Sequence, residues 1–159
     1  MQPVSDKPVV AITVGDFNGI GPEVTLKSLT EPEVWDACQP LLVGPRQVFE
    51  YYATQYRLPF ALPSDHPDQN LFHTDDVQVN EIHSGKLSRR AGHVAANAIK
   101  AAVSLVQQGR ADAMVTAPVS KKSLHMAGVI FPGQTEMVQH LSGSKHVAMM
   151  LVSATMRVG

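Results

Sequence analysis

Strand signals alternate with helix signals along this chain, and that alternation constrains its fold more than any other feature. Residues 9–14, V-V-A-I-T-V, form an apolar, β-branched run between Pro8 and Gly15, which predicts a buried strand. Pro22 and Glu23 then suit the first turn of a helix, because proline has no N–H to leave unpaired there and glutamate favours the positive helix end. Strands that alternate with helices imply an α/β fold with a largely parallel sheet, covered by helices on both faces.

The same criteria place the remaining elements. Ser88 and Gly109 suit the two ends of the clearest helix, as N-cap and as the left-handed residue that stops it. Helices are expected over 22–29, 46–56, 88–108, 120–127 and 133–141. Strands are expected over 9–14, 41–43, 77–82, 113–117 and 147–152, with a further strand beginning at 156–158. The proline-rich residues 59–70 read as a surface connection.

Composition excludes several classes of protein. The chain has 159 residues, 44% of them hydrophobic, and a formal net charge of −1, which marks neither a nucleic-acid binder nor a membrane binder. Cys38 is the only cysteine, so an internal disulfide and a cysteine-based metal site are both excluded. The start of the chain lacks the pattern of a signal peptide, and no apolar run is long enough to span a membrane. We therefore expect a cytoplasmic protein.

Parallel sheets bind ligands outside the carboxyl ends of their strands, which directs attention to three loops. The first, residues 15–23, reads G-D-F-N-G-I-G-P-E and matches neither a P-loop nor the dinucleotide fingerprint. It either brings backbone N–H groups to an anionic ligand or makes a tight structural turn, and the residues favour neither interpretation.

The second and third loops carry side chains suited to binding. Residues 116–121, T-A-P-V-S-K, either pair Lys121 with a phosphate or carboxylate or form an ordinary strand-to-helix loop, which is the commoner case. Gln134 and Thr135 open a helix, where free N–H groups, an amide and a hydroxyl can bind an oxyanion, unless they serve only as a simple helix cap. We expect the turn before Pro22 and the helix start at Thr135 to face a common cleft. The seven histidines are dispersed and lack the spacing of a helical zinc site.

Four segments in order resemble one family, the 4-hydroxythreonine-4-phosphate dehydrogenases. Residues 11–23, A-I-T-V-G-D-F-N-G-I-G-P-E, resemble its opening I-T-x-G-D-P-A-G-I-G-P-E. Residues 84–92, S-G-K-L-S-R-R-A-G, resemble its G-K-x-S-x-x-A-G, and 116–122 resemble its T-A-P-[IVL]-x-K. Residues 131–136, F-P-G-Q-T-E, resemble its F-x-G-H-T-E. The match covers nearly the whole chain.

The resemblance implies a fold like isocitrate and isopropylmalate dehydrogenases. Residues 1–127 would be the N-terminal part of a first α/β domain, and 128–159 the start of a second. It also implies a homodimer that oxidises and decarboxylates 4-phosphooxy-threonine with NAD or NADP and a divalent metal (Zn, Mg or Co), on the route to pyridoxal phosphate.

Only two site residues carry over from the family. Thr135 falls on its substrate-binding threonine, and Gln134 replaces its substrate-binding histidine. Glutamine cannot carry charge near neutral pH, so a related substrate such as threonate or erythronate phosphate stays open. A phosphate acyltransferase and an inactive ligand-binding remnant stay open as well. No catalytic, cofactor-binding or metal residue is assigned, because the family's three metal-binding histidines, and most of its phosphate and cofactor contacts, fall after residue 159. We therefore expect an incomplete, truncated chain.

These 159 residues alone are expected to lack dehydrogenase activity, since the metal ligands of the family match no residue in them. The measurement is reduction of NAD, followed by absorbance, with purified chain, divalent metal and a phosphorylated hydroxy acid. Turnover in that assay would refute the expectation.

Overall fold

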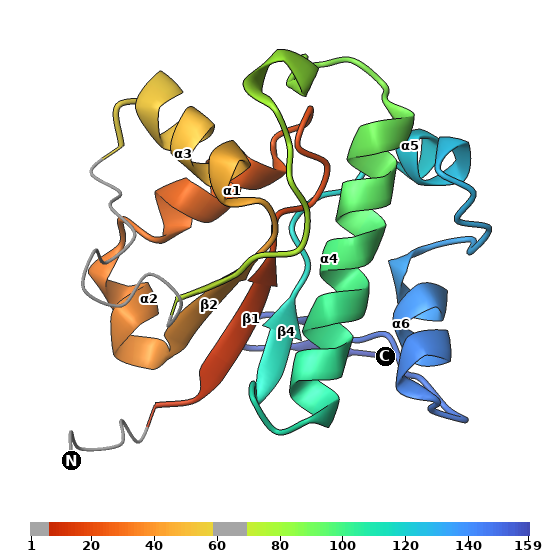
Figure 1. Cartoon of the computed structure of the whole chain (residues 1–159). Helices are drawn as coiled ribbons and strands as arrows, with labels where there is room; N and C mark the ends of the chain where they lie inside the picture. Colours follow the sequence, from red (N-terminus) through yellow and green to blue (C-terminus); the bar gives the residue numbers. More distant parts are fainter. Residues whose placement is uncertain (1–6, 59–69) are drawn as a thin grey trace.

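A four-stranded parallel sheet forms the centre of the molecule (Figure 1). The computed structural model describes residues 7–58 and 70–159, so nearly all of the expected connection 59–70 lies outside the described residues. The sheet has the order β3-β2-β1-β4. Its strands are β1 (Val9–Thr13), β2 (Gln39–Val43), β3 (Leu71–Phe72) and β4 (Ala113–Val115). The α/β class and the parallel sheet expected from the sequence are thus confirmed.

Helices connect successive strands, as parallel pairing requires. The helices α1 (Gly21–Ser28) and α2 (Pro32–Ala37) lead from β1 to β2, and α3 (Arg46–Gln55) leads from β2 to β3. The long helix α4 (Arg89–Gln107) leads back across the sheet and packs over β1 and β4 (Figure 1). The chain therefore adds β2 and β3 on one side of β1 and then returns to add β4 on the other side, so that the strand order reverses between β1 and β4.

Both ends of α4 are as the sequence predicts. The Ser88 hydroxyl accepts hydrogen bonds from the N–H groups of Arg90 at 3.1 Å and Ala91 at 3.3 Å, which caps the helix. Gly109 follows its last turn in the left-handed conformation, with φ of 67°. The small residues on the packed face of α4 allow neighbouring elements to approach closely, most of all at Gly92.

Gly92 sets the distance between α4 and α5 (Lys121–Met126). A Cβ atom at this position would lie only 1.9 Å from the Ser123 carbonyl oxygen of α5. The glycine that ends the S-G-K-L-S-R-R-A-G segment is therefore required by packing between two helices.

The loop after β1 is fixed by a tyrosine from α3. Tyr52 is 1% exposed, and its hydroxyl donates to the Phe17 carbonyl oxygen at 2.7 Å. The same hydroxyl lies 3.2 Å from Ser84 Oγ. Burial is the main cause that raises the pKa of the Tyr52 phenol, because the phenolate would lose its hydration.

One predicted strand is not a strand in the structure. Residues 79–81 form a short 3₁₀ helix, so the predicted strand over 77–82 is wrong. Val77 and Val79 alternate with polar residues as they would in a strand, but only Val77 is buried, while Val79 is 57% exposed. The strand beside β2 is instead the two-residue β3, which the sequence does not reveal. The helix α2 was also not predicted.

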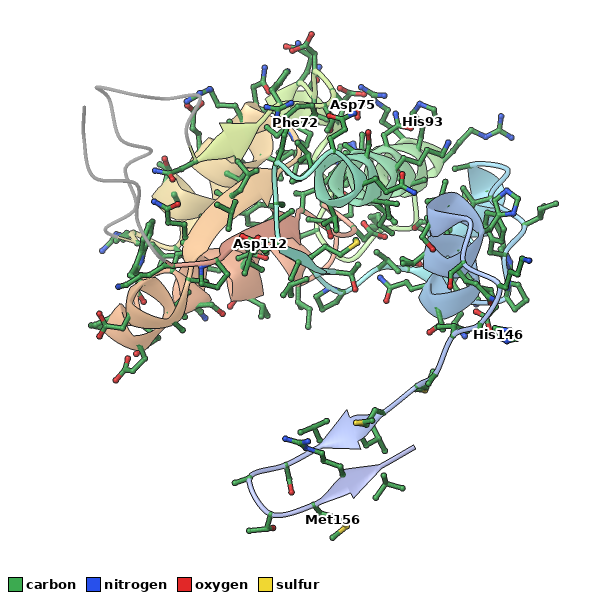
Figure 2. The ribbon with its side chains drawn as sticks, turned by 90° about the horizontal axis from the view of Figure 1, so that it is seen from below. Phe72, Asp75, His93, Asp112, His146 and Met156 are labelled. Carbon is green, nitrogen blue, oxygen red and sulfur yellow. The ribbon has the colours of Figure 1, made fainter. Side chains whose placement is uncertain are left out.

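The strand β4 is shorter than predicted and is not buried, since Val115 is 51% exposed at the edge of the sheet. After it, α5 leads to α6 (Gln134–Ser142), which packs against α4. The strands β5 (Leu151–Val152) and β6 (Arg157–Val158) pair antiparallel and are shorter than expected. Figure 2 shows this hairpin lying away from the rest of the chain.

Substituting Gly92→Ala should destabilise the chain by about 1–3 kcal/mol, because the added methyl group meets the α5 backbone. In an unobstructed helix interior the same change stabilises by roughly 1 kcal/mol. The sign of the change in unfolding free energy, measured with urea, therefore distinguishes a close contact with α5 from an unobstructed helix position. Lys100→Ala, at an exposed position of α4, is the control.

Substituting Tyr52→Phe should lower the unfolding free energy at neutral pH by about 1–2 kcal/mol, since the Phe17 carbonyl loses its donor. Because the pKa of Tyr52 is raised on folding, its stabilising effect is present below a pH of about 10 and is lost as the pH rises through the folded pKa. Tyr52→Phe should therefore flatten the loss of stability above that pH. An unchanged alkaline slope, or an equal effect of Tyr51→Phe, would contradict this role.

Candidate functional site

The reversal of strand order between β1 and β4 marks the place where open α/β sheets usually bind ligands. Here that crevice is closed by the chain itself. The Asp16 N–H donates to the Pro118 carbonyl oxygen at 3.0 Å, and the Ala117 N–H donates to Thr13 Oγ1 at 3.2 Å. The loops that follow β1 and β4 are thus joined by hydrogen bonds at the point where a dinucleotide would be expected.

The glycines after β1 make this contact possible. Gly15 has φ of 69°, and a Cβ atom there would lie 2.4 Å from the Pro118 carbonyl oxygen. At Gly21 a Cβ atom would lie 2.6 Å from the Val14 carbonyl oxygen. The loop also uses its own N–H groups, since Gly19 donates to the Asp16 carbonyl oxygen at 2.9 Å. These contacts favour a tight structural turn over a cradle for an anion.

Asn18 ties this turn to the loop that precedes α4. Its side chain is buried and accepts from the His83 N–H at 2.8 Å while donating to the Lys86 carbonyl oxygen at 3.1 Å. The Asn18 carbonyl oxygen accepts from the Gly85 N–H at 2.7 Å. The asparagine that departs from the family's pattern therefore has a structural role.

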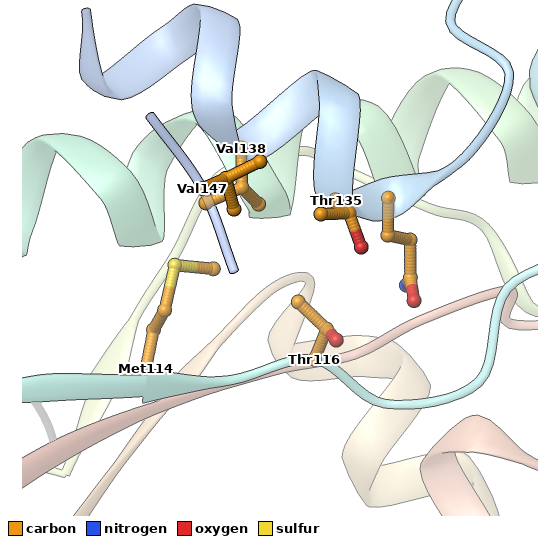
Figure 3. Close-up of a pocket in the computed structure, with 6 residues that line it drawn as sticks. Met114, Thr116, Thr135, Val138 and Val147 are labelled. Atoms are coloured by element: carbon orange, nitrogen blue, oxygen red, sulfur yellow. The ribbon is translucent and has the colours of Figure 1, made fainter. Parts of the chain in front are cut away.

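Polar groups converge instead between β4 and the start of α6. A cavity of about 310 Å³ is lined there by Thr116, Gln134 and Thr135, with an apolar end made by Met114, Val138 and Val147. Figure 3 shows the side chains of Thr116 and Thr135 facing each other across it. Two hydroxyls and an amide beside an apolar wall suit a small polar ligand with a carbon backbone.

Gln134 has an unsatisfied donor in this region. Its Nε2 atom is buried and has no hydrogen-bond partner among the described residues. Leaving a buried donor unpaired costs about 1–3 kcal/mol, so an acceptor oxygen that pairs with it would be stabilising. Thr135 lies next to it in the first turn of α6, where the helix leaves its own N–H groups free.

A second cavity, of about 260 Å³, is also lined by Gln134. Lys121 and His125 of α5 line it together with Phe131 and Gly133. Gln134 is the residue that both cavities share.

The two cavities that Gln134 lines do not show the expected common cleft. Neither of the two cavities lined by Gln134 contains a residue from 15–22. Pro118 is the link between the two regions, because it accepts from Asp16 and also lines the second cavity. The structure therefore brings Thr116 and Lys121 to the start of α6, in two cavities that share Gln134.

Sequence reasoning missed most of the residues that complete these cavities. The apolar walls, from Met114, Phe131, Val138 and Val147, come from segments whose proximity the sequence does not show. One sequence signal could have indicated His125: it lies four residues from Lys121 on a predicted helix, so the two side chains share a face.

Within 7–58 and 70–159, no three His, Cys, Asp or Glu residues are grouped so that they could hold a metal ion. Over the same residues, no helix is both long and apolar enough to cross a membrane.

Comparison with known proteins gives a consistent result. The family described as "Pyridoxal phosphate biosynthetic protein PdxA" matches residues 36–159. The D-threonate 4-phosphate dehydrogenase of Cupriavidus necator is 38% identical over 95% of this chain and 48% of its own length. The 4-hydroxythreonine-4-phosphate dehydrogenase of Trichlorobacter lovleyi is 34% identical over 96% of this chain and 48% of its own.

A solved structure agrees with these sequences. The crystal structure of a 4-hydroxythreonine-4-phosphate dehydrogenase from Burkholderia phymatum superimposes with a TM-score of 0.82 at 36% identity, over 95% of this chain and 48% of that one. The chain thus spans about half the length of the curated relatives that it matches.

Proposed function

We propose that this chain forms part of a dehydrogenase acting on a small phosphorylated hydroxy acid, because it belongs to the family of pyridoxal phosphate biosynthetic proteins PdxA. The observation that carries this proposal is the unpaired, buried Nε2 atom of Gln134 at the start of α6, beside the Thr135 hydroxyl. A buried donor without a partner, in a residue that lines a cavity, supports a site for an oxygen-rich ligand.

Gln134 and Thr135 bind and orient the substrate in this account. The amide and the hydroxyl donate to its oxygen atoms, and Thr116 offers a third polar group from the end of β4. The positive end of α6 favours a substrate that carries negative charge. The apolar end of the cavity accommodates the carbon chain.

Which acid is oxidised depends on Gln134. Our first candidate is 4-phosphooxy-threonine, as the family resemblance implies. The second is D-threonate 4-phosphate, which differs from it by a hydroxyl in place of an ammonium group. A neutral amide in place of the family's histidine, together with the name of the relative from Cupriavidus necator, supports the second candidate.

NAD or NADP as oxidant, metal assistance and decarboxylation are further parts of the proposal. The described residues do not fit a metal ion, so we assign no step through a metal to them. A dinucleotide does not fit the crevice between β1 and β4, because the hydrogen bonds of Asp16 and Ala117 close it. The contacts to both groups would come from polypeptide outside the described residues.

The β5–β6 hairpin supports the proposed start of a second domain within 128–159. Its apolar side chains are exposed, with Leu151 at 72% and Val152 at 64%. A two-stranded hairpin is at best marginally stable in water by itself. We propose that further polypeptide, in an isocitrate dehydrogenase-like second domain of a homodimer, covers these side chains.

Substituting Thr135→Val removes a hydroxyl at nearly constant shape and should weaken binding of 4-phosphooxy-threonine or D-threonate 4-phosphate roughly threefold to tenfold. Calorimetric titration of the purified chain measures this. Thr155→Val, in the exposed hairpin, is the matched control and should bind like the unmodified chain. Equal affinity of the Thr135 variant, or no binding of either acid to the unmodified chain, would count against the proposal.

A further inference from the structure

We propose that a third cavity, formed by α3 and the 3₁₀ helix at 79–81, binds a small ligand that carries a guanidinium group. The cavity has a volume of about 350 Å³. It shares no lining residue with either cavity beside Gln134, so the inference does not rest on the proposed function. Its lining residues are Gln47, Glu50, Tyr51, Thr54, Gln55 and Val79.

One face of α3 supplies all of these residues except Val79. Positions 47, 50, 51, 54 and 55 have the spacing of side chains that share one face of an α-helix. The opposite face of α3 is buried in the core. Val79, which is 57% exposed, adds an apolar wall from the 3₁₀ helix. The cavity thus combines a polar helix face with an apolar contact.

Gln47 carries an unpaired hydrogen-bond acceptor at this cavity. Its Nε2 atom donates to Asp76 Oδ1 at 3.3 Å, and because an ionised carboxylate can only accept, Asp76 fixes the orientation of the amide. The Oε1 atom is buried and has no hydrogen-bond partner among the described residues. An unpaired buried acceptor is unfavourable, so a ligand N–H that pairs with Oε1 would be stabilising.

The other polar groups of the lining also favour a ligand with donors and positive charge. Glu50 supplies a carboxylate, and none of the lining residues is a lysine, arginine or histidine. Arg46 Nη1 lies 3.9 Å from Glu50, but an exposed pair of this kind is weak and competes little for the carboxylate. The Thr54 hydroxyl donates to the Glu50 carbonyl oxygen at 2.9 Å, which leaves its oxygen as an acceptor.

A guanidinium group matches this lining better than a compact ammonium group. Gln47 and Glu50 lie three residues apart on α3, so their side chains are neighbours. The guanidinium fork presents five N–H donors in one plane, which can serve an amide oxygen and a carboxylate together. Its face also stacks on aromatic rings, and Tyr51 offers one that an edge-to-face contact with Tyr52 holds at 5.1 Å.

Two sources share this chemistry, a free small molecule and an arginine side chain of another polypeptide. The cavity volume falls within the range of small-molecule sites, which favours the free molecule. Agmatine represents the free molecule, and N-acetylarginine methylamide represents an arginine within a polypeptide. Whichever of the two binds more tightly identifies the source.

The experiment is an amide NMR titration of the purified chain with methylguanidinium chloride at constant ionic strength and millimolar concentration. We expect saturable chemical-shift changes at 47–55 and 79, and at least about threefold weaker binding of methylammonium chloride. Glu50→Gln should weaken the binding of methylguanidinium roughly threefold to tenfold. Glu33→Gln, which removes the same charge from an exposed position of α2, should leave the affinity unchanged.

Gln47→Met removes the unpaired acceptor at similar side-chain length and should also weaken binding, with circular dichroism to verify the fold. Glu50 is exposed and its variant keeps the contact between Gln47 and Asp76, so it tests the site even if Gln47→Met perturbs folding. Absence of saturable changes, the result if only water occupies the cavity, would overturn the proposal. Equal effects of Glu50→Gln and Glu33→Gln, or equal affinities for methylguanidinium and methylammonium, would overturn it too.

Discussion

The hydrogen bonds that join the loops after β1 and β4 determine where this protein can bind a ligand. Thr13 is buried at the end of β1, and its hydroxyl accepts from the Ala117 N–H, while the Asp16 N–H donates to the Pro118 carbonyl oxygen. Buried backbone groups must be paired, so these bonds are costly to break. Gly15 is needed because any side chain there would meet the Pro118 backbone. A crevice that holds cofactors in many α/β proteins is thereby filled by the chain.

Because that crevice is closed, the polar groups that could bind a ligand lie instead near residues 116–121 and the start of α6. Residues 117–121 lead from this crevice to α5. Gln134, the first residue of α6, lines two cavities. One cavity combines hydroxyls with apolar walls, and the other carries the charges of α5.

The features that the sequence predicted well are those that local chemistry determines. The helix α4 has an unbroken apolar stripe, a serine cap and a terminal glycine, all within one stretch of chain. The strand β3 escaped prediction because its two residues are ordered by pairing with β2. Gln134 and Thr135 stand at the predicted helix start, while their role in binding stays a prediction from the family motif. The grouping of Lys121 with Gln134 could not be found, because it depends on how α5 and α6 fold back on each other.

Amide NMR of this 17.2 kDa chain tests most directly whether ligands bind on the α6 side of the closed crevice. On titration with 4-phosphooxy-threonine or D-threonate 4-phosphate, the account predicts chemical-shift changes at 116–121 and 133–138, with the amides of 15–21 unaffected. Changes at Gly15 to Gly21 as large as those at Thr135 would show that the glycine loop binds the ligand and would contradict the account.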